Sequence, residues 1–393
     1  MPKVNPDILI WAREKAGLTI DEAVERLDMP DARGVLAANR LRELETGKTE
    51  PSRPLLIRMA KLYRRPLLLF YMTKPPLKGD RGQDFRTLPA DYSASDEGLI
   101  DALIRNVLAR QSVLRAALED EDDIEAVEFV NSMSMKDGVL KVLALLRALL
   151  QVDHKNFYSQ PDPDRAFSLL RSRAESAGVF VLLIGDLGNH HTKIDLELFR
   201  GFALADKLVP FIVINDHDNH SAWSFTLLHE LVHIIIGQSG ISGAVNEQVV
   251  EKFCNEVAGE FLLPTEEIKE MNPNNLRIFD DAKDEILYFA MRRNLSNSMV
   301  AYKLFLQGAI DLTMWTRLSQ FFRELWLNAR AEKKFRAVEN KDGPSYYIVR
   351  KHRVGKTLIN LVSQMMRNGT ITTTKAGQIL GVKAKNVHHL MEA

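Results

Sequence analysis

Residues 223–237 read WSFTLLHELVHIIIG, and they contain the motif on which the prediction of the fold depends. Apolar residues surround His229, Glu230 and His233 on nearly every side, which is typical of a helix buried in a domain core. On such a helix the two histidines, four residues apart, project from one face, so two imidazole nitrogens can meet one cation. Glu230 points about 100° further round, within reach of a water on that cation. Gly237 then supplies a stop.

The alternative to a metal site is a buried helix that carries two hydrogen-bonded histidines and an ion-paired glutamate. Burying three titratable groups on an apolar segment is costly without a cation or other partners, which favours the metal site. A catalytic zinc usually takes three protein ligands and leaves its fourth position to water. The sequence therefore predicts a third ligand elsewhere in the chain.

The third ligand is expected on the next predicted helix, residues 247–263, which read EQVVEKFCNEVAGEFLL. The apolar residues of this segment form one broad stripe along a helix. By helical angle, Glu247 and Glu251 lie at one margin of the stripe. Glu256 and Glu260 lie toward the other margin. Helical geometry alone leaves both margins open.

A resemblance to a known family separates these candidates. The segment FTLLHELVH, followed after a short loop by EKFCNEVAGEFLLP, resembles the ImmA/IrrE family of metallo-endopeptidases, whose pattern is HExxH and then roughly ExxANxFAxxLLMP. The resemblance implies that His229, His233 and Glu251 are zinc ligands. It also implies that Glu230 is the general base and acid. The chain departs from this pattern at Cys254, Val257 and Leu263. Each is an apolar substitution, and the ligand positions are unchanged. We interpret Cys254 as a small buried hydrophobe rather than an alternative ligand or a reactive thiol.

Composition indicates an ordinary soluble protein of two or three domains. The chain has 393 residues, 46% hydrophobic and 26% charged, with a formal net charge of zero. Its single cysteine excludes an intramolecular disulfide and suits a reducing compartment. No opening signal segment is evident, and no apolar run approaches the ~20 residues of a membrane span. We expect a cytoplasmic protein that does not contact the membrane.

The neutral total conceals an uneven distribution of charge. Residues 331–393 hold twelve Lys and Arg against four Asp and Glu, and residues 1–76 hold fourteen against ten. The residues between these ends carry a net charge of −12. Basic ends around an acidic middle indicate a nucleic-acid contact at one or both ends, although solvated surfaces explain such excesses equally well.

The N-terminal segment, residues 1–76, predicts a helical domain. Thr19 is expected to cap a helix, and Glu22 completes a capping box. Residues 41–71 resemble the second half of the XRE-type helix-turn-helix domain, and the resemblance extends to the ImmA/IrrE subgroup in which such a domain precedes the peptidase.

The segment MPDARGVLAANRLR, residues 29–42, is longer than an ordinary XRE turn and recognition helix, so no residues that read base edges are assigned. Arg33, Arg40 and Arg42 are candidates for phosphate contact. The alternative for this domain is a helical bundle that holds a repressor-like partner or packs on the peptidase.

The predicted fold class is α+β and mostly helical, with a small zincin domain of the gluzincin-like HExxH type and a short sheet. Strands are predicted at 179–185, 199–204 and 208–215. The last is expected to be an edge strand whose free backbone groups can pair with an extended substrate. Weaker candidates for metal or substrate contact are the loop histidines His190, His191, His217 and His220.

The domain order follows from these segments. Residues 1–76 are the helix-turn-helix domain, 77–160 a linker and helical spacer, and 161–270 the zinc metallopeptidase domain. Residues 271–340 are a helical appendage. Residues 341–393 are a basic helical segment that could form a second helix-turn-helix.

The predicted activity is zinc-assisted peptide hydrolysis, in which Glu230 takes a proton from water and returns it to the leaving amine. The resemblance implies a repressor or antitoxin-like protein substrate within a regulatory circuit, with DNA as a second partner through the N-terminal domain. The alternative is an XRE-type DNA-binding regulator or antitoxin that uses the zincin fold as a sensor or scaffold. The presence of all three ligand residues and of the glutamate argues against an inactive peptidase.

Overall fold

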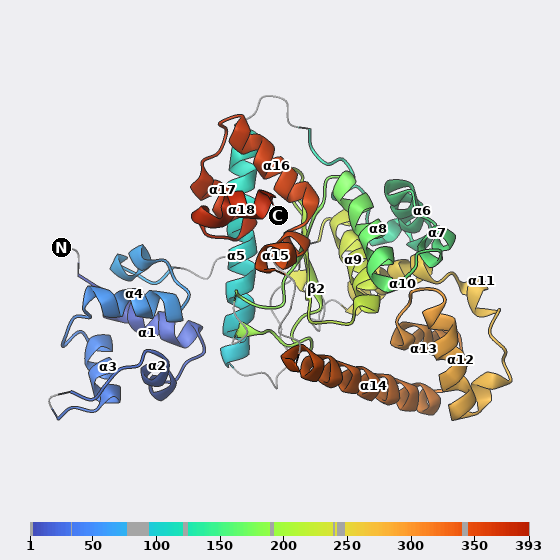
Figure 1. The fold of residues 1–393 in the computed structure, drawn as a ribbon, viewed down its shortest axis with the longest axis horizontal. Helices are drawn as coiled ribbons and strands as arrows, with labels where there is room; N and C mark the ends of the chain where they lie inside the picture. Colours follow the sequence, from blue (N-terminus) through green and yellow to red (C-terminus); the bar gives the residue numbers. More distant parts are fainter. Residues whose placement is uncertain are drawn as a thin grey trace. The chain divides into compact units, whose positions relative to one another are not determined.

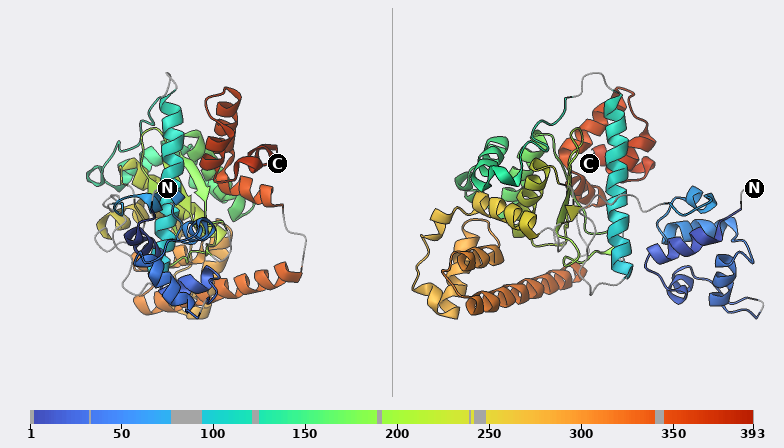
Figure 2. Two further views of the ribbon diagram at one scale, coloured as in Figure 1. Left: turned by 90° about the vertical axis from the view of Figure 1, so that its left-hand side faces the viewer. Right: turned by 180° about the vertical axis from the view of Figure 1, so that it is seen from behind.

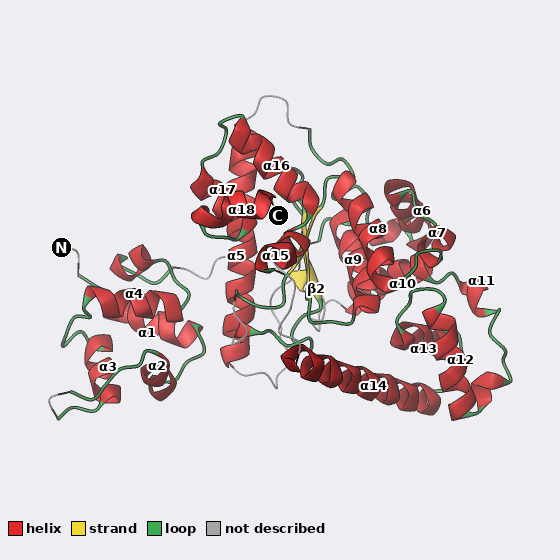
Figure 3. Ribbon diagram, viewed as in Figure 1, coloured by secondary structure: helices red, strands yellow, loops and turns green. Residues whose placement is uncertain are grey.

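The chain folds into two compact units (Figure 1). Unit 1 comprises Met1–Val107 and Asp186–Leu198, and unit 2 comprises Leu108–Gly185 and Phe199–Ala393. The computed structural model describes residues 3–32, 34–76, 94–120, 125–188, 192–238, 240–241, 248–339 and 345–392. Within these residues the chain is mostly helical with one small sheet, which confirms the α+β class (Figure 3). None of the helices described there is both long enough and apolar enough to cross a membrane.

The N-terminal helices of unit 1 pack around a hydrophobic core of their own. Thr19 and Glu22 form the predicted capping box at the start of α2, in which the Thr19 N–H donates to Glu22 Oε2 at 2.8 Å. Arg13 Nε donates to Glu45 Oε1 at 2.7 Å inside the bundle and so joins α1 to α3. The elements are α1 (Pro6–Lys15), α2 (Ile20–Arg26), α3 (Ala37–Glu45), α4 (Arg53–Leu62) and the 3-10 helix η1 (Leu67–Tyr71).

The sheet belongs to unit 2 and has the strand order β1-β3-β2-β4. Strand β3 pairs in parallel with β1 and antiparallel with β2. The prediction that residues 208–215 form an edge strand was therefore wrong, because β3 is central. All four residues of β3 are buried, which is the pattern of a strand covered on both faces rather than at an edge. The strands are β1 (Phe180–Leu183), β2 (Gly201–Leu204), β3 (Phe211–Ile214) and the two-residue β4 (Gly240–Ile241).

One hydrophobic core joins this sheet to helices α6 to α10 and continues into the helices that follow them. Alternate strand residues, among them Val181, Ala203 and Ile212, belong to this core, so one face of the sheet packs on α8 and α9. Leu146 of α6 and Phe157 of α7 lie in the same core, so these helices are part of the body that holds the candidate site. The five helices are α6 (Val139–Leu150), α7 (His154–Tyr158), α8 (Pro163–Ser176), α9 (His220–Ile235) and α10 (Gln248–Leu262).

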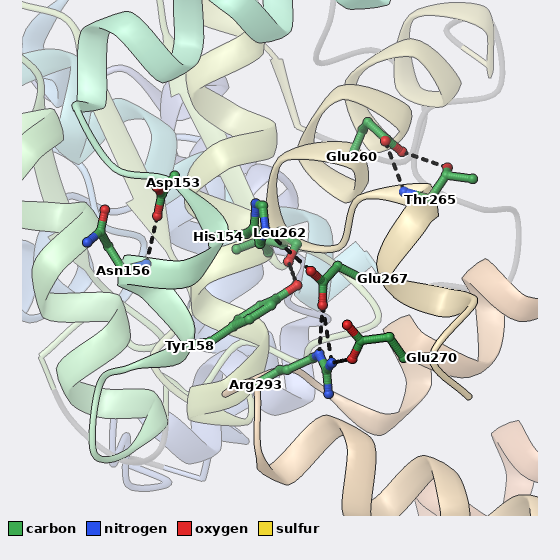
Figure 4. Close-up of polar contacts among 10 residues, drawn as sticks. All are labelled: Asp153, His154, Asn156, Tyr158, Glu260, Leu262, Thr265, Glu267, Glu270 and Arg293. Atoms are coloured by element: carbon green, nitrogen blue, oxygen red, sulfur yellow. Dashed lines mark hydrogen bonds and ion pairs between the residues drawn. The ribbon is translucent and has the colours of Figure 1, made fainter. Parts of the chain in front are cut away.

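A polar network anchors the end of α10 to the helices around it (Figure 4). The Tyr158 hydroxyl donates to the Leu262 carbonyl at 2.7 Å. Arg293 Nη2 donates to Glu267 Oε2 at 3.1 Å, and His154 Nε2 lies 3.4 Å from Glu267 Oε1. The network therefore joins α7, the end of α10 and α11 to the residue pair that follows α12. The helices that follow α10 are α11 (Thr265–Ile268), η5 (Asn275–Arg277), α12 (Phe279–Met291), α13 (Asn297–Leu306) and α14 (Leu312–Glu339).

The last helices of the chain cluster on the opposite side of the sheet from α8 and α9 (Figures 1 and 2). Helix α15 contacts β1, and Arg353 at its end forms an ion pair with Asp216, with Nε and Oδ2 2.6 Å apart. The second half of α5 (Ala94–Glu119) is part of unit 2, where Gln111 Nε2 donates to the Val209 carbonyl at 2.8 Å. The C-terminal elements are α15 (Tyr346–Val354), α16 (Lys356–Arg367), α17 (Thr373–Leu380), η6 (Ala384–Asn386) and α18 (Val387–Glu392). A short 3-10 helix, η2 (Met135–Asp137), precedes α6.

Candidate metal centre

Helix α9 carries the HExxH residues and is buried along most of its length. Its N-cap is Asn219, whose side-chain oxygen accepts from the Ser221 N–H at 3.3 Å. The exposed fractions of His229, Glu230 and His233 are 4%, 1% and 5%. The three titratable residues therefore lie in the interior, as the apolar setting of the motif predicted.

The end of α9 is held by the segment before α6. Gly237 adopts φ +72°, and a Cβ built there would lie 2.2 Å from Asn131 Oδ1. The Asn131 N–H donates to the Ile234 carbonyl at 3.0 Å, and the Met133 N–H donates to the Ile235 carbonyl at 3.2 Å. These bonds satisfy carbonyls that a helix end leaves open, so the histidine-bearing helix ends at a defined place.

Helix α10 brings Glu251 to the two histidines. The residues Cys254, Val257 and Phe261 are buried on the face that packs against α9 and α6. Glu251 lies at the margin of this face, with Oε2 3.2 Å from His229 Nε2 and Oε1 3.2 Å from His233 Nε2. The two Nε2 atoms are 3.1 Å apart.

The other glutamates of this segment lie away from the histidines. Glu256 is exposed, and Glu260 accepts from Lys303 Nζ at 2.6 Å and from the Thr265 N–H at 3.1 Å. Glu247 lies outside the described residues. Among the described candidates, Glu251 is the one that the fold places beside both imidazoles.

The two imidazole nitrogens and the Glu251 carboxylate are as close together as the ligands of one tetrahedral metal ion. A tetrahedral ion with bonds of ~2.0–2.1 Å separates its ligand atoms by about 3.3–3.4 Å. The two Nε2 atoms lie 3.1 Å apart, and each lies 3.2 Å from a different oxygen of the Glu251 carboxylate, so the spacing of the three side chains is close to that of ligands on one such ion. His229, His233 and Glu251 are the group of His, Cys, Asp and Glu residues that could hold a metal ion within the described part of the chain. Three such ligands leave one position of a tetrahedral ion for water or substrate.

The protonation state of Glu251 also fits a cation ligand. Burial by itself would raise the pKa of this carboxyl group. The adjacent imidazoles of His229 and His233 outweigh burial and lower the pKa to about 2. Glu251 is therefore charged at neutral pH, which is the state in which a carboxylate binds a metal ion.

Glu230 lies against strand β2, where residue 201 has no side chain. A Cβ built on Gly201 would lie 2.9 Å from Glu230 Oε1 and 2.6 Å from Thr226 Cγ2. Both distances are shorter than real Cβ atoms show, so β2 and α9 approach this closely only because residue 201 is glycine. Gly201 was not among the residues predicted to matter for the site. The available signal was a glycine at the start of a buried apolar strand.

The loop histidines do not join the three-residue group. His220 is the first residue of α9, where Nδ1 contacts Asp164 Oδ1 and the ring stacks on Trp223 with centroids 4.1 Å apart. The His217 N–H donates to Asn215 Oδ1 at 3.1 Å in the turn before α9. His190 and His191 lie outside the described residues.

Two of the arginines considered for phosphate contact, Arg40 and Arg42, lie in α3 of unit 1. Arg40 Nη1 donates to the Pro30 carbonyl, and Arg42 Nη1 donates to Asn39 Oδ1 at 2.9 Å. Arg33 lies outside the described residues. Arg40 and Arg42 thus make local contacts with their own bundle.

Comparison with known proteins identifies the part of the chain that holds this centre. Residues 181–305 match the family model of the IrrE N-terminal-like domain, peptidase family M78. This range extends from β1 into α13 and includes both α9 and α10. The match supports the resemblance to the ImmA/IrrE family and indicates a peptidase domain of metallopeptidase type. Comparison of the chain with curated proteins and with solved structures gave no match.

Proposed function

We propose that this protein is a zinc-dependent endopeptidase of the ImmA/IrrE type. The observation that carries the proposal is the convergence of three side chains: Nε2 of His229 and Nε2 of His233 lie 3.1 Å apart, and each lies 3.2 Å from an oxygen of the Glu251 carboxylate. These atoms come from two successive helices, and the buried Glu230 lies one residue from the first of them. The domain match over residues 181–305 supports the same activity.

His229, His233 and Glu251 would hold the cation in this proposal. When bound, the cation lowers the pKa of a water toward ~7 and polarises a carbonyl oxygen. Glu230 accepts the proton of the attacking water and delivers it to the leaving amine. Gly201 provides the space in which the Glu230 carboxylate lies, so the strand β2 sets the direction from which this carboxylate acts.

We infer that the substrate is a repressor or antitoxin-like protein. The resemblance of residues 41–71 to an XRE-type domain supports a regulatory circuit, because such a domain precedes the peptidase in the subgroup that the chain resembles. The burial of the centre supports cleavage of a locally extended segment. The side chains of His229, His233 and Glu251 are only 5%, 6% and 15% exposed, so a flat folded surface does not reach them.

The experiment that tests the proposal separates metal binding from proteolysis. Glu230→Gln is expected to keep zinc, measured by mass spectrometry of the purified protein, and to abolish cleavage. Cleavage is measured by mapping new protein N-termini in cells that express the wild type or the variant. Glu256→Gln is the matched control, because this exposed glutamate on α10 faces away from the histidines and its loss should change neither result. Equal cleavage by wild type and Glu230→Gln, or a wild type without bound metal, would contradict the proposal.

A further inference from the structure

The C-terminal helices carry a concentration of positive charge that the proposed peptidase does not use. Residues 345–392 contain eight Lys and Arg and one acidic residue, Glu392, in a chain whose net charge is zero. Arg353 is paired with Asp216 in the fold. Exposed basic side chains of this segment are Lys356, Arg367, Lys375, Lys383 and Lys385.

Helices α17 and α18 are joined by a turn that brings them into close contact. Helix α17 ends at Gly381, which adopts φ +66°, and η6 and α18 follow directly. A Cβ built on Gly377 would lie 2.8 Å from the Val382 carbonyl oxygen and 3.2 Å from the Ala384 nitrogen. The chain can therefore cross α17 at this distance only because residue 377 is glycine. This is the arrangement of a helix-turn-helix, in which two helices are joined by a short turn containing glycine.

Helices α17 and α18 bury apolar side chains, and hydrogen bonds from α15 hold the turn between them. Ile379 and Leu380 of α17 are buried, as are Val387 and Leu390 of α18. Arg350 of α15 donates from Nη2 to the Leu380 carbonyl at 3.2 Å and to the Gly381 carbonyl at 2.7 Å. Arg350 of α15 thus holds the backbone of the turn, from which the exposed side chains extend.

The outward side chains are basic or polar at the positions where a helix-turn-helix meets DNA. Lys383 and Lys385 are exposed in and directly after the turn, and His388 is exposed on α18. Thr374 and Lys375 are exposed at the start of α17. In this motif the first helix crosses the phosphate backbone and the start of the second helix enters the major groove. Lysine and threonine donate to phosphate oxygens, which position the protein on the duplex.

We propose that the surface around Lys383, Lys385 and His388 binds double-stranded DNA, with the two lysines contacting phosphates and His388 directed at base edges. Duplex DNA is the partner that fits, because its major groove admits a helix whereas the deep, narrow major groove of duplex RNA does not. The excess of positive charge over this segment is the electrostatic requirement for such binding. This inference does not depend on the proposed peptidase activity.

The test measures binding of the full chain to a fluorescein-labelled DNA duplex of random sequence, by fluorescence anisotropy over a range of salt concentrations. Lys383→Glu/Lys385→Glu removes two proposed phosphate contacts. The expected result is a loss of affinity of about 50-fold near 0.1 M salt and a decrease of about 2 in the slope of log K against log salt. Lys141→Glu/Lys155→Glu is the matched control, because it makes the same change in net charge at exposed positions of α6 and α7.

All four lysines are exposed, so both variants are expected to fold. Circular dichroism and thermal unfolding check that they do. The proposal stands if the wild type and the control bind DNA with the same affinity and salt dependence, and if the Lys383/Lys385 variant shows the expected loss of affinity and the smaller slope. Absence of binding by the wild type at low salt overturns it. Equal binding by the Lys383/Lys385 variant also overturns it and moves DNA binding to another part of the chain. Preferential competition by RNA rather than by duplex DNA overturns the assignment of the partner.

Discussion

Replacing Gly201 by alanine should displace the Glu230 carboxylate and leave the three-residue metal group in place. The new methyl group would lie 2.6 Å from Thr226 Cγ2 and 2.9 Å from Glu230 Oε1. Thr226 is β-branched and packs in the helix, so its methyl group has little rotational freedom. The carboxylate of Glu230 is the end of a longer side chain and moves more readily. His229, His233 and Glu251 are not among the nearest neighbours of that methyl group.

The magnitudes differ for stability and for activity. Overpacking of a close-packed core typically costs about 1–3 kcal/mol, so we expect Gly201→Ala to lower the free energy of unfolding by that amount. A displacement of a catalytic group by ~1 Å can cost about 10²-fold in rate, so kcat should fall by about that factor. Zinc content should stay equal to that of the wild type.

The assay compares kcat, KM, zinc content and thermal unfolding for three variants of the full chain. Gly201→Ala/Thr226→Ser removes the closer of the two contacts, so it should recover stability but not kcat, because the contact with Glu230 remains. Gly259→Ala is the matched control. A Cβ at Gly259 of α10 meets nothing within 4 Å, so this change should stabilise the helix by ~1 kcal/mol and leave kcat unchanged.

Recovery of kcat together with stability in Gly201→Ala/Thr226→Ser would refute this reasoning. In that event Gly201 would act only by allowing β2 to pack on Thr226, and the position of Glu230 would not depend on it. A fully active and stable Gly201→Ala would refute the packing argument as well.

Three further predictions concern the metal group and the network at the end of α10. Glu251→Gln removes a charged ligand, so the purified variant should contain substoichiometric zinc by mass spectrometry, whereas full zinc content would exclude Glu251 as a ligand. Removing metal with a chelator should lower the unfolding temperature, because a cation present at 1,000 times its Kd stabilises the folded state by about 4 kcal/mol; identical calorimetric scans would contradict this. Arg293→Ala leaves the half-buried Glu267 without its guanidinium and should cost about 2–3 kcal/mol in denaturant unfolding. A change below about 0.5 kcal/mol, which is ordinary for a surface substitution, would show that the network contributes little.

The parts of the structure that local chemistry determines were predictable from the sequence. The spacing of His229 and His233 and the stop at Gly237 gave α9, and the buried apolar runs gave the three main strands. The capping box of Thr19 and Glu22 was confirmed for the same reason. Each of these features depends on residues within a few positions of one another, so the periodicity and end signals of the segment contain the necessary information.

The choice of Glu251 needed more than periodicity. Helical angle placed glutamates at both margins of the α10 stripe, and which margin faces the histidines depends on how α10 packs against α9 and α6. That packing is decided by Cys254, Val257 and Phe261 together with residues far away in sequence. Only the resemblance to a known family supplied this information before the structure did.

The error about β3 and the omission of Gly201 have one cause. Both depend on which strands and helices pack against a strand, and the residues of the strand do not identify those neighbours directly. Four consecutive buried residues in β3 are compatible with a central strand but not with an edge exposed to substrate, so the buried run itself argued against the prediction. For β2 the corresponding evidence was a glycine where a β-branched residue would favour the strand more. A residue that weakens its own strand is expected where another group needs the space, and here that group is the carboxylate of Glu230.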